Sequence, residues 1–374
     1  MTSSTSSSSR VGFVHPTFWR ATGASALCLG ALLLAGCGSS NGSNSATSST
    51  GSGTTGSSTT GGSTGDGNGG AKVSVFMLPK KKGVAYFTSC SKGAQKAADA
   101  SGVELTYDGP TDGKPEGAAT LIEKAALKGT NVIAVSPNDP DVLALAMKKA
   151  KDQGTHVITW DADGNKDARE WFVNQATSQQ IGTALVDTMV KDLGGGQPEG
   201  DVAIITATLT AANQNEWIKA MKEQLKKYPK LNLLPIKPSN EDQKEAFSVA
   251  QDLMKTYPNL KGIWGISSVS FPGAAEAVKQ AGKTGKVLVT GLSTPNDMKS
   301  YVKDGTVKSV ILWNTEDLGA LTVKVAQAVA QGRLKAGATE FDAGNLGKKK
   351  VVGDNILLGD ILIFNKDNID KYNF

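Results

Sequence analysis

From residue 72 to the C-terminus, short apolar runs alternate with segments in which apolar side chains recur every three or four positions. The runs are rich in valine and isoleucine and end at polar residues or proline, a pattern that predicts buried strands. The segments between the runs predict helices with one buried face. The predicted strands cover 73–78, 103–107, 132–135, 157–160, 171–173, 202–206, 231–236, 262–266, 287–290, 310–313 and 361–364.

The predicted helices follow these strands in alternation. They comprise a helix that begins at Thr88, one near 116–127, one with Val142, Leu145, Ala146 and Ala150, one with Ile181, Leu185 and Met189, one with Trp217, Met221 and Leu225, one with Phe247, Ala250 and Leu253, one starting near Pro272, and one near 316–330. Repeating units of ~30 residues predict parallel sheets flanked by helices, the α/β class. Some ten strands in about 300 residues favour two doubly wound lobes over a single sheet.

Polar and aromatic side chains gather at the ends of the predicted strands, where ligands bind in parallel sheets. The polar ones are Lys80, Asp161, Asn213, Gln214, Ser267, Ser268 and Asn314, and the aromatic ones are Tyr86, Phe87, Trp160, Trp217, Trp264 and Trp313. Carboxylate, amide and ammonium groups satisfy sugar hydroxyls, and aromatic rings cover the C–H faces of a sugar. The set predicts a site for a small carbohydrate or polyol, although each polar residue taken singly is as consistent with a helix cap.

The chain is poorly supplied for catalysis by side chains. His156 is the only histidine after residue 71 and begins a predicted strand, and no cysteine–histidine cluster has zinc spacing. Asp161 and Asp163 are the only obvious carboxylate pair at a strand end, and they need not converge. Cys90 is either a small packed residue or, near a helix N-terminus, a reactive thiol. We expect no cofactor, no metal and no enzymatic activity.

Residues 1–71 follow a different pattern. Arg10 and Arg20 precede an uncharged stretch, 21–36, which ends in Leu-Ala-Gly before Cys37. This ending looks like a lipobox, so a signal peptide over 1–36 and a lipidated Cys37 are expected. A plain transmembrane anchor is the alternative, but such a span needs ~20 apolar residues. Residues 37–71, mostly serine, glycine and threonine, predict a disordered tether.

The predicted lipobox also indicates where the protein is located. We expect a protein that is lipid-anchored to the outer face of the cytoplasmic membrane, at the cell membrane or in the periplasm.

The net charge of +5 comes from lysines scattered along predicted helices, which is typical of a solvated surface and not of a nucleic-acid footprint. With Cys28 in the signal peptide and Cys37 lipidated, Cys90 is left without a disulfide partner.

Several motifs together resemble the type I periplasmic sugar-binding proteins of ABC importers. Within them, the chain is similar to the branch that holds rhamnose-binding proteins and the Lsr-type autoinducer-2 receptor. The segments that carry this resemblance are 106–111 (TYDGPT), 159–161 (TWD), 213–217 (NQNEW), 291–296 (GLSTPN), 301–307 (YVKDGTV) and 363–372 (IFNKDNIDKY).

The resemblance implies two lobes joined by a three-segment hinge. The N-terminal lobe is expected to comprise 72–174 with 314–338, and the C-terminal lobe 175–313 with 339–374. A ligand is expected to be closed between the lobes and delivered to an ABC import permease. A monomer is expected.

The site residues of the autoinducer-2 receptor carry over only in part. Its lysine, first aspartate and glutamine fall on Lys80, Asp161 and Gln214, whereas its second aspartate, proline and alanine fall on Asn213, Ile266 and Ser268. The loss of a carboxylate and the gain of a hydroxyl favour a monosaccharide, for instance a deoxyhexose such as rhamnose, with autoinducer-2 as the alternative. The predicted ligand-binding set is Lys80, Phe87, Asp161, Asn213, Gln214, Ile266, Ser268, Trp313 and Asn314.

Two competing functions fit less well. A hydrolase needs a convergent acid–base pair, and a sugar-responsive repressor of similar fold needs an N-terminal helix-turn-helix where this chain has the predicted signal peptide and tether. We therefore expect no nucleic-acid partner. Replacement of Asp161 by alanine is expected to weaken ligand binding with little effect on folding.

Overall fold

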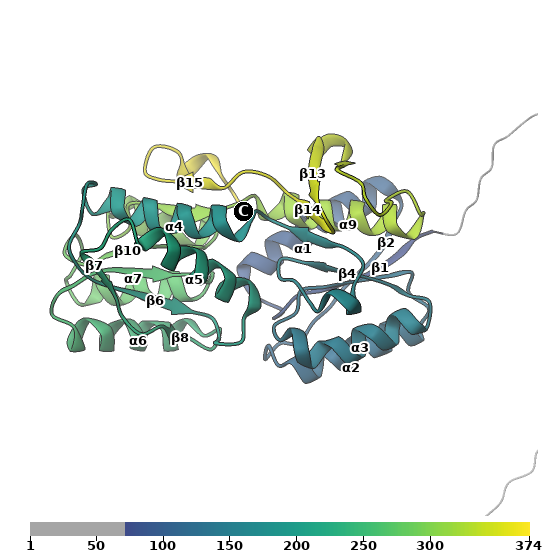
Figure 1. Cartoon of the computed structure of the whole chain (residues 1–374), viewed down its shortest axis with the longest axis horizontal. Coiled ribbons are helices and arrows are strands. Elements are labelled where there is room, and N and C mark those ends of the chain that lie inside the picture. Colours follow the sequence, from purple (N-terminus) through teal and green to yellow (C-terminus); the bar gives the residue numbers. More distant parts are fainter. Residues whose placement is uncertain (1–71) are drawn as a thin grey trace, which may run out of the picture. The chain divides into compact units, whose positions relative to one another are not determined.

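The structure, a computed structural model, describes residues 72–374. The predicted signal peptide, the lipidated Cys37 and the tether lie outside the described residues. Between residues 72 and 374, no helix combines the length and the apolar character needed to cross a membrane. This part of the chain is an α/β structure built on two large sheets, each flanked by helices (Figure 1).

The first sheet has eight strands in the order β12-β13-β14-β5-β4-β3-β1-β2. From β2 to β14 all neighbours pair in parallel, and β13 and β12 extend the sheet as antiparallel strands. The strands are β1 (Ser74–Leu78), β2 (Glu104–Tyr107), β3 (Val132–Val135), β4 (His156–Trp160), β5 (Phe172–Asn174), β12 (Glu340–Asp342), β13 (Lys348–Val352) and β14 (Asn355–Leu357).

Helices cover both faces of this sheet. One face holds α1 (Ala85–Ser101) and α9 (Thr315–Ala330), which pack together, and the other holds α2 (Pro115–Leu127) and α3 (Pro140–Asp152). Successive β1 residues accordingly belong to two hydrophobic clusters: Val75 and Met77 pack with α1, and Phe76 and Leu78 with α2 and α3. Burial on both faces explains why these strands read as continuous apolar runs.

The second sheet has the order β10-β9-β6-β7, with β8 also paired to β6, and all its pairs are parallel. Helix α4 packs on α5 and α6 on α7, and α4 and α6 lie on opposite sides of the sheet (Figure 1). The elements are β6 (Gly200–Thr206), β7 (Leu231–Leu233), β8 (Lys237–Pro238), β9 (Leu260–Gly265), β10 (Leu288–Gly291), α4 (Ser178–Asp192), α5 (Ala212–Leu225), α6 (Gln243–Thr256), α7 (Ser270–Gln280) and α8 (Pro295–Lys303).

A small antiparallel pair completes the structure. β11 (Val310–Leu312) pairs with β15 (Leu362–Phe364), and a single bridge from Leu292 to Ile311 links β11 to the end of β10. The single-turn helices η1 (Lys166–Ala168), η2 (Gly344–Leu346) and η3 (Ile369–Lys371) lie in loops. The chain passes between the two sheets at 175–177, at 313–314 and at 358–361.

The last of these passages differs from the sequence-based expectation, which placed all of 339–374 with the second lobe. Strands β12, β13 and β14 instead extend the first sheet, and only the segment from β15 onward returns to the second. The buried Arg169 holds this extension, because its guanidinium contacts Asp163 after β4 and Asp354 before β14, both at 2.6 Å. The segment is therefore fixed to the first sheet by an ion-paired arginine as well as by strand pairing.

Two helices also differ from the prediction. Helix α1 begins at Ala85, three residues before the predicted start at Thr88, and its N-cap residue Val84 makes no side-chain capping bond. The usual capping signal was therefore missing, and Thr88 lies inside the first turns. Helix α8 was not predicted, because only Pro295, Met298 and Val302 of its nine residues are buried.

Candidate functional site

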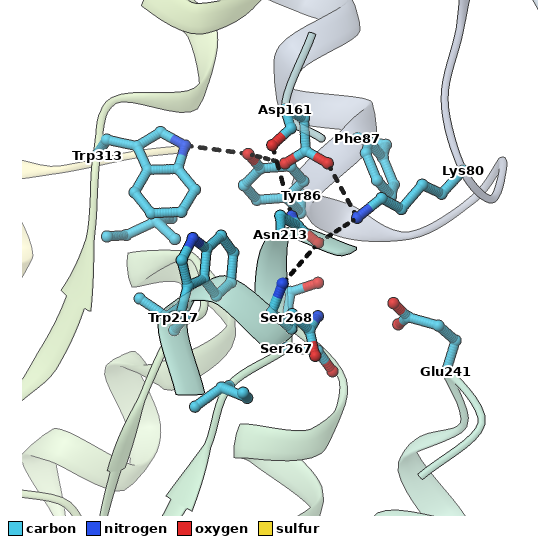
Figure 2. Close-up of a pocket in the computed structure, with 14 residues that line it drawn as sticks. Lys80, Tyr86, Phe87, Asp161, Asn213, Trp217, Glu241, Ser267, Ser268 and Trp313 are labelled. Carbon is cyan, nitrogen blue, oxygen red and sulfur yellow. Dashed lines mark hydrogen bonds and ion pairs between the residues drawn. The ribbon is translucent and has the colours of Figure 1, made fainter. Parts of the chain in front are cut away.

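A cavity of about 40 Å³ lies where the carboxyl ends of both sheets meet (Figure 2). Its walls come from the loops after β1, β4, β8, β9 and β10, from the N-terminal turns of α1 and α5, and from the end of β11. The lining residues are Lys80, Tyr86, Phe87, Asp161, Asn213, Gln214, Trp217, Glu241, Ile266, Ser267, Ser268, Leu292, Leu312 and Trp313. The volume leaves room for a few water-sized positions, so a larger ligand has to displace side chains that now touch one another.

Asp161 is the polar centre of this cavity. Its carboxylate accepts hydrogen bonds from Tyr86 Oη at 2.8 Å and Ser136 Oγ at 2.9 Å, and Lys80 Nζ lies 3.4 Å away. The residue is buried and has a left-handed backbone with φ of 62°. A non-glycine residue in this conformation carries strain, which proteins retain mainly at functional sites. The bend after β4 turns the carboxylate towards the cavity (Figure 2).

Lys80 and Asn213 join the two sheets across the cavity. Lys80 Nζ donates to Asn213 Oδ1 at 3.1 Å, and Asn213 Nδ2 donates to the backbone oxygen of Asp161 at 3.4 Å. Gln214 is also buried, but its side-chain oxygen is occupied by Thr206 Oγ1 at 2.5 Å and by the Ala207 amide at 2.8 Å. Only the amide nitrogen of Gln214 therefore remains to meet a ligand.

Aromatic rings form the apolar wall. Tyr86 and Phe87 lie edge to face with 5.1 Å between centroids, and Trp217 and Trp313 pack at 6.1 Å. Trp313 Nε1 donates to Tyr86 Oη at 3.0 Å, so the indole, the phenol and the Asp161 carboxylate form a chain of hydrogen bonds. Burial raises the pKa of Tyr86, and the Asp161 charge raises it further. The Tyr86 hydroxyl thus stays neutral and acts as a donor.

The structure brings eight of the nine predicted site residues to this cavity and leaves one out. Asn314 does not line it: the Asn314 side chain caps α9 by accepting from the Asp317 amide at 3.2 Å. Trp160 and Trp264 are also absent from the wall, since their indole N–H groups donate to backbone oxygens inside the core. The other eight predicted residues are Lys80, Phe87, Asp161, Asn213, Gln214, Ile266, Ser268 and Trp313.

Glu241, Leu292 and Leu312 line the cavity without having been predicted. Leu292 and Leu312 lie at strand ends but carry no polar signal. Glu241 follows β8, a strand of two residues, Lys237–Pro238, which lies just beyond the predicted strand 231–236 and was not predicted. Its φ of 53° is a structural signal that the sequence does not contain.

The groups considered for catalysis are engaged elsewhere. Asp163 pairs with Arg169, with 2.9 and 2.6 Å between the carboxylate oxygens and the guanidinium nitrogens, and His156 Nδ1 contacts Glu170 at 2.9 Å. Cys90 is buried, and burial raises the pKa of its thiol, which fits a packed residue and not a reactive one. Among residues 72–374, no group of three or more histidine, cysteine or acidic side chains could hold a metal ion.

Comparison with known proteins gives consistent results. The profile of the periplasmic binding protein domain matches residues 75–334. The ribose import binding protein of Salmonella typhimurium is 26% identical over 267 residues, which cover 71% of this chain and 87% of that protein.

Two solved structures extend the comparison. LsrB from Clostridium saccharobutylicum in complex with AI-2 is 30% identical, with a TM-score of 0.77, over 81% of this chain and 100% of that one. An ABC transporter solute-binding protein from Clostridium phytofermentas with bound L-rhamnose is also 30% identical, with a TM-score of 0.76, over 80% of this chain and 98% of that one.

Two α/β lobes with a polar and aromatic cavity between their strand ends define a ligand-binding protein of the type I periplasmic fold. The chain belongs to the periplasmic binding protein family. The expected family and fold are thereby confirmed. Members of this family bind solutes outside the cytoplasm and are not enzymes, which agrees with the expected extracytoplasmic location and lack of catalysis.

Proposed function

We propose that this protein captures a monosaccharide in the cavity and delivers it to an ABC import permease. The observation that carries the proposal is the combination of Lys80, Asp161 and Asn213, joined across the two sheets, with an aromatic wall of Tyr86 and Trp313. Charged and amide groups meet hydroxyls, and the rings meet C–H faces. Sugars named for similar proteins, ribose and L-rhamnose among them, support the same substrate class.

We further propose a deoxyhexose such as rhamnose as the ligand. Asn213 supplies an amide at the position where the autoinducer-2 receptor has a second carboxylate, and a carboxylate would accept hydrogen bonds from more ligand hydroxyls. Ser268 adds a hydroxyl to the cavity wall. Autoinducer-2 is the second candidate. It is favoured by Lys80, Asp161 and Gln214 together and by the similarity to LsrB in complex with AI-2.

Isothermal titration of L-rhamnose, D-ribose, D-fucose, D-arabinose and autoinducer-2 tests the proposal. We expect one monosaccharide to bind with a dissociation constant of about 1 µM or lower, equivalent to about 8 kcal/mol. Tightest binding of autoinducer-2 would favour the second candidate, and binding of none of them would remove the sugar-receptor proposal.

We propose lobes that follow the sheets: 72–174 with 315–357, and 178–312 with 362–374. Support for this division comes from strand pairing, since β12 to β14 extend the first sheet. The monomeric state remains part of the proposal, and light scattering of the purified protein would test it.

We also propose that Cys37 is lipidated and anchors the protein to the membrane. Two or more acyl chains bind durably, since each buried methylene contributes about 0.8 kcal/mol. Cys37→Ser is expected to move the protein from the membrane fraction to the soluble fraction. Cys28→Ser, inside the predicted signal peptide, is the matched control and should leave the distribution unchanged. A mature-length Cys37→Ser protein that stays with membranes would contradict the anchor.

A further inference from the structure

The loop that connects β8 to α6 is held in a strained conformation against the cavity. Asn240 and Glu241 both have left-handed backbones, with φ of 51° and 53°. The loop is fixed on both sides: the Ser239 amide donates to Thr206 O at 2.8 Å, and Asp242 caps α6 by accepting from two backbone amides. Strain retained in a braced loop points to a side chain whose position matters.

The side chain placed by this loop is Glu241. It lines the cavity with Lys80 and Asp161, and Figure 2 shows its carboxylate directed towards the cavity on the side of Ser267 and Ser268. The backbone oxygen of Glu241 accepts from Lys81 Nζ at 3.1 Å, a contact between the two sheets. The backbone is thus held in place while the carboxylate faces the interior.

Within residues 72–374, the Glu241 carboxylate has no hydrogen-bond or ion-pair partner, as is also true of the Ser268 hydroxyl and the Gln214 amide nitrogen. Asp161 is satisfied by Tyr86, Ser136 and Lys80, and Ser267 Oγ donates to Ser270 Oγ at 3.0 Å. By contrast, among the hydrogen bonds and ion pairs of residues 72–374, the Glu241 carboxylate takes part in none. Its lone pairs are left for whatever enters the cavity.

We infer that Glu241 is a specificity-determining residue, whose carboxylate accepts a hydrogen bond from a hydroxyl at the end of the ligand away from Asp161. This inference rests on the proposed sugar-binding function. Two carboxylates, Asp161 and Glu241, and one ammonium, Lys80, line the cavity, and the Lys81 ammonium lies beside the Glu241 backbone. These charges balance one another, which favours a neutral polyhydroxylated ligand over a sugar acid or a sugar phosphate. Glu241 is half-buried at the cavity wall, and loss of solvent there raises the pKa of its carboxyl.

The test compares Glu241→Gln with the wild type by isothermal titration, using the monosaccharide that the wild type binds best. Glutamine has about the size of glutamate and tolerates a left-handed backbone about as well. The melting temperatures of the variant and the wild type should therefore agree. We expect affinity to fall about tenfold or more, since a charge-assisted hydrogen bond is lost. Glu223→Gln, an exposed residue paired with Lys226 on α5, is the control and should bind as the wild type does.

Deoxy analogues of the same sugar identify the hydroxyl that Glu241 contacts. For one analogue, wild type and Glu241→Gln should bind equally, because the hydroxyl is already absent. Glu241→Asp, which keeps the charge but withdraws the carboxylate by one methylene, should also lose affinity. If both variants match the wild type for every sugar, the inference is wrong while the proposed function stands. If the wild type binds no sugar, both the inference about Glu241 and the proposed function are wrong.

Discussion

At the scale of single residues, Asp161 contributes to both folding and the proposed ligand binding. It is held by Tyr86, Ser136 and Lys80, all of which would lose a partner if the carboxylate were removed. An alanine here would also have to adopt φ near 62°, which is unfavourable for residues other than glycine, asparagine and aspartate. The expectation that Asp161→Ala spares folding is therefore replaced by one in which folding and binding both suffer.

Asp161→Asn separates the two effects, because asparagine tolerates the left-handed backbone and keeps one acceptor oxygen. We expect ligand affinity to fall about tenfold to a hundredfold, as for loss of a charge-assisted hydrogen bond of about 1.5–3 kcal/mol. The free energy of unfolding should fall by about 1–3 kcal/mol, since one buried donor loses its acceptor. Titration and urea denaturation measure the two quantities. Asp167→Asn, an exposed carboxylate paired with Lys148, is the control; normal binding by Asp161→Asn would place the ligand elsewhere.

Asp192 predicts a pH dependence of stability. Burial at the C-terminal end of α4 raises the pKa of this carboxyl, against the opposing effects of Ser309, which donates at 2.9 Å, and of Lys308. A raised folded-state pKa means that its contribution to stability is fully present below the unfolded pKa and is lost as pH rises through the folded value.

Asp192→Asn mimics the protonated carboxyl and should therefore be more stable than the wild type at pH 7. We expect this advantage to shrink as the pH is lowered towards about 4, the usual range of an aspartate carboxyl. Urea denaturation of both proteins at pH 7, 5.5 and 4 gives the comparison. An advantage that stays constant over this range would contradict the role of Asp192.

At the scale of secondary-structure elements, the site depends on the crossing of α1 and α9. Gly93 and Gly319 lie at this crossing, and a Cβ atom at Gly319 would be 1.8 Å from the backbone oxygen of Cys90. The first turn of α1 carries Tyr86 and Phe87, while Trp313 lies next to Asn314, the N-cap of α9. The distance between the two helices therefore sets the aromatic wall of the cavity.

Gly319→Ala should force the two helices apart, because backbone atoms cannot yield as a side chain can. We expect a loss of about 1–3 kcal/mol or more in the free energy of unfolding, as for overpacking of a core. Affinity should fall as well, since Tyr86 and Trp313 move apart. Gly117→Ala in α2 is the control: its Cβ would meet only Pro110 at 3.5 Å, so the change should be neutral or stabilising. Equal melting temperatures for the two variants would refute the argument.

The elements that the sequence predicted well are those whose burial is uniform. β3 has four buried residues and matches the predicted strand 132–135, and the buried face of α4 contains the predicted Ile181, Leu185 and Met189. The strands β12 to β14 were missed because most of their residues are half-buried or exposed, including Lys348, so they show no apolar run. Their place is decided by tertiary contacts such as Arg169 with Asp354.

The same distinction holds for the cavity. Lys80 and Asp161 could be predicted because each lies within two residues of the end of a buried strand. In parallel sheets such positions come together at the carboxyl edge. Asn314 also follows a buried strand, but its side chain caps α9. The sequence alone does not distinguish a helix cap from a ligand-binding residue at such a position. Glu241 was not predicted, because it is placed in the cavity by a two-residue strand and a strained loop. Neither feature has a recognisable sequence pattern.

At the scale of the whole described region, the two sheets meet through few polar contacts. Lys80 donates to Asn213, and Lys81 donates to the backbone oxygen of Glu241 at 3.1 Å. Each pair joins a loop of the first lobe to a residue of the second, so we expect these bonds to break when the lobes open. A ligand that bridges the same loops should favour the closed state, and small-angle scattering should then show a smaller radius of gyration at saturation.

Lys81 offers the sharpest test of closure because its neighbour Lys82 is a matched control. Lys82 Nζ donates at 2.9 Å to Asp108, which belongs to the same lobe, so its bond does not depend on closure. Lys81→Met should lower affinity about twofold to tenfold, the value of a net hydrogen bond of about 0.5–1.5 kcal/mol, through faster dissociation. Lys82→Met should leave dissociation unchanged. Equal dissociation rates for both variants, with no change in the radius on ligand addition, would mean that the site is preformed and that closure plays no part in binding.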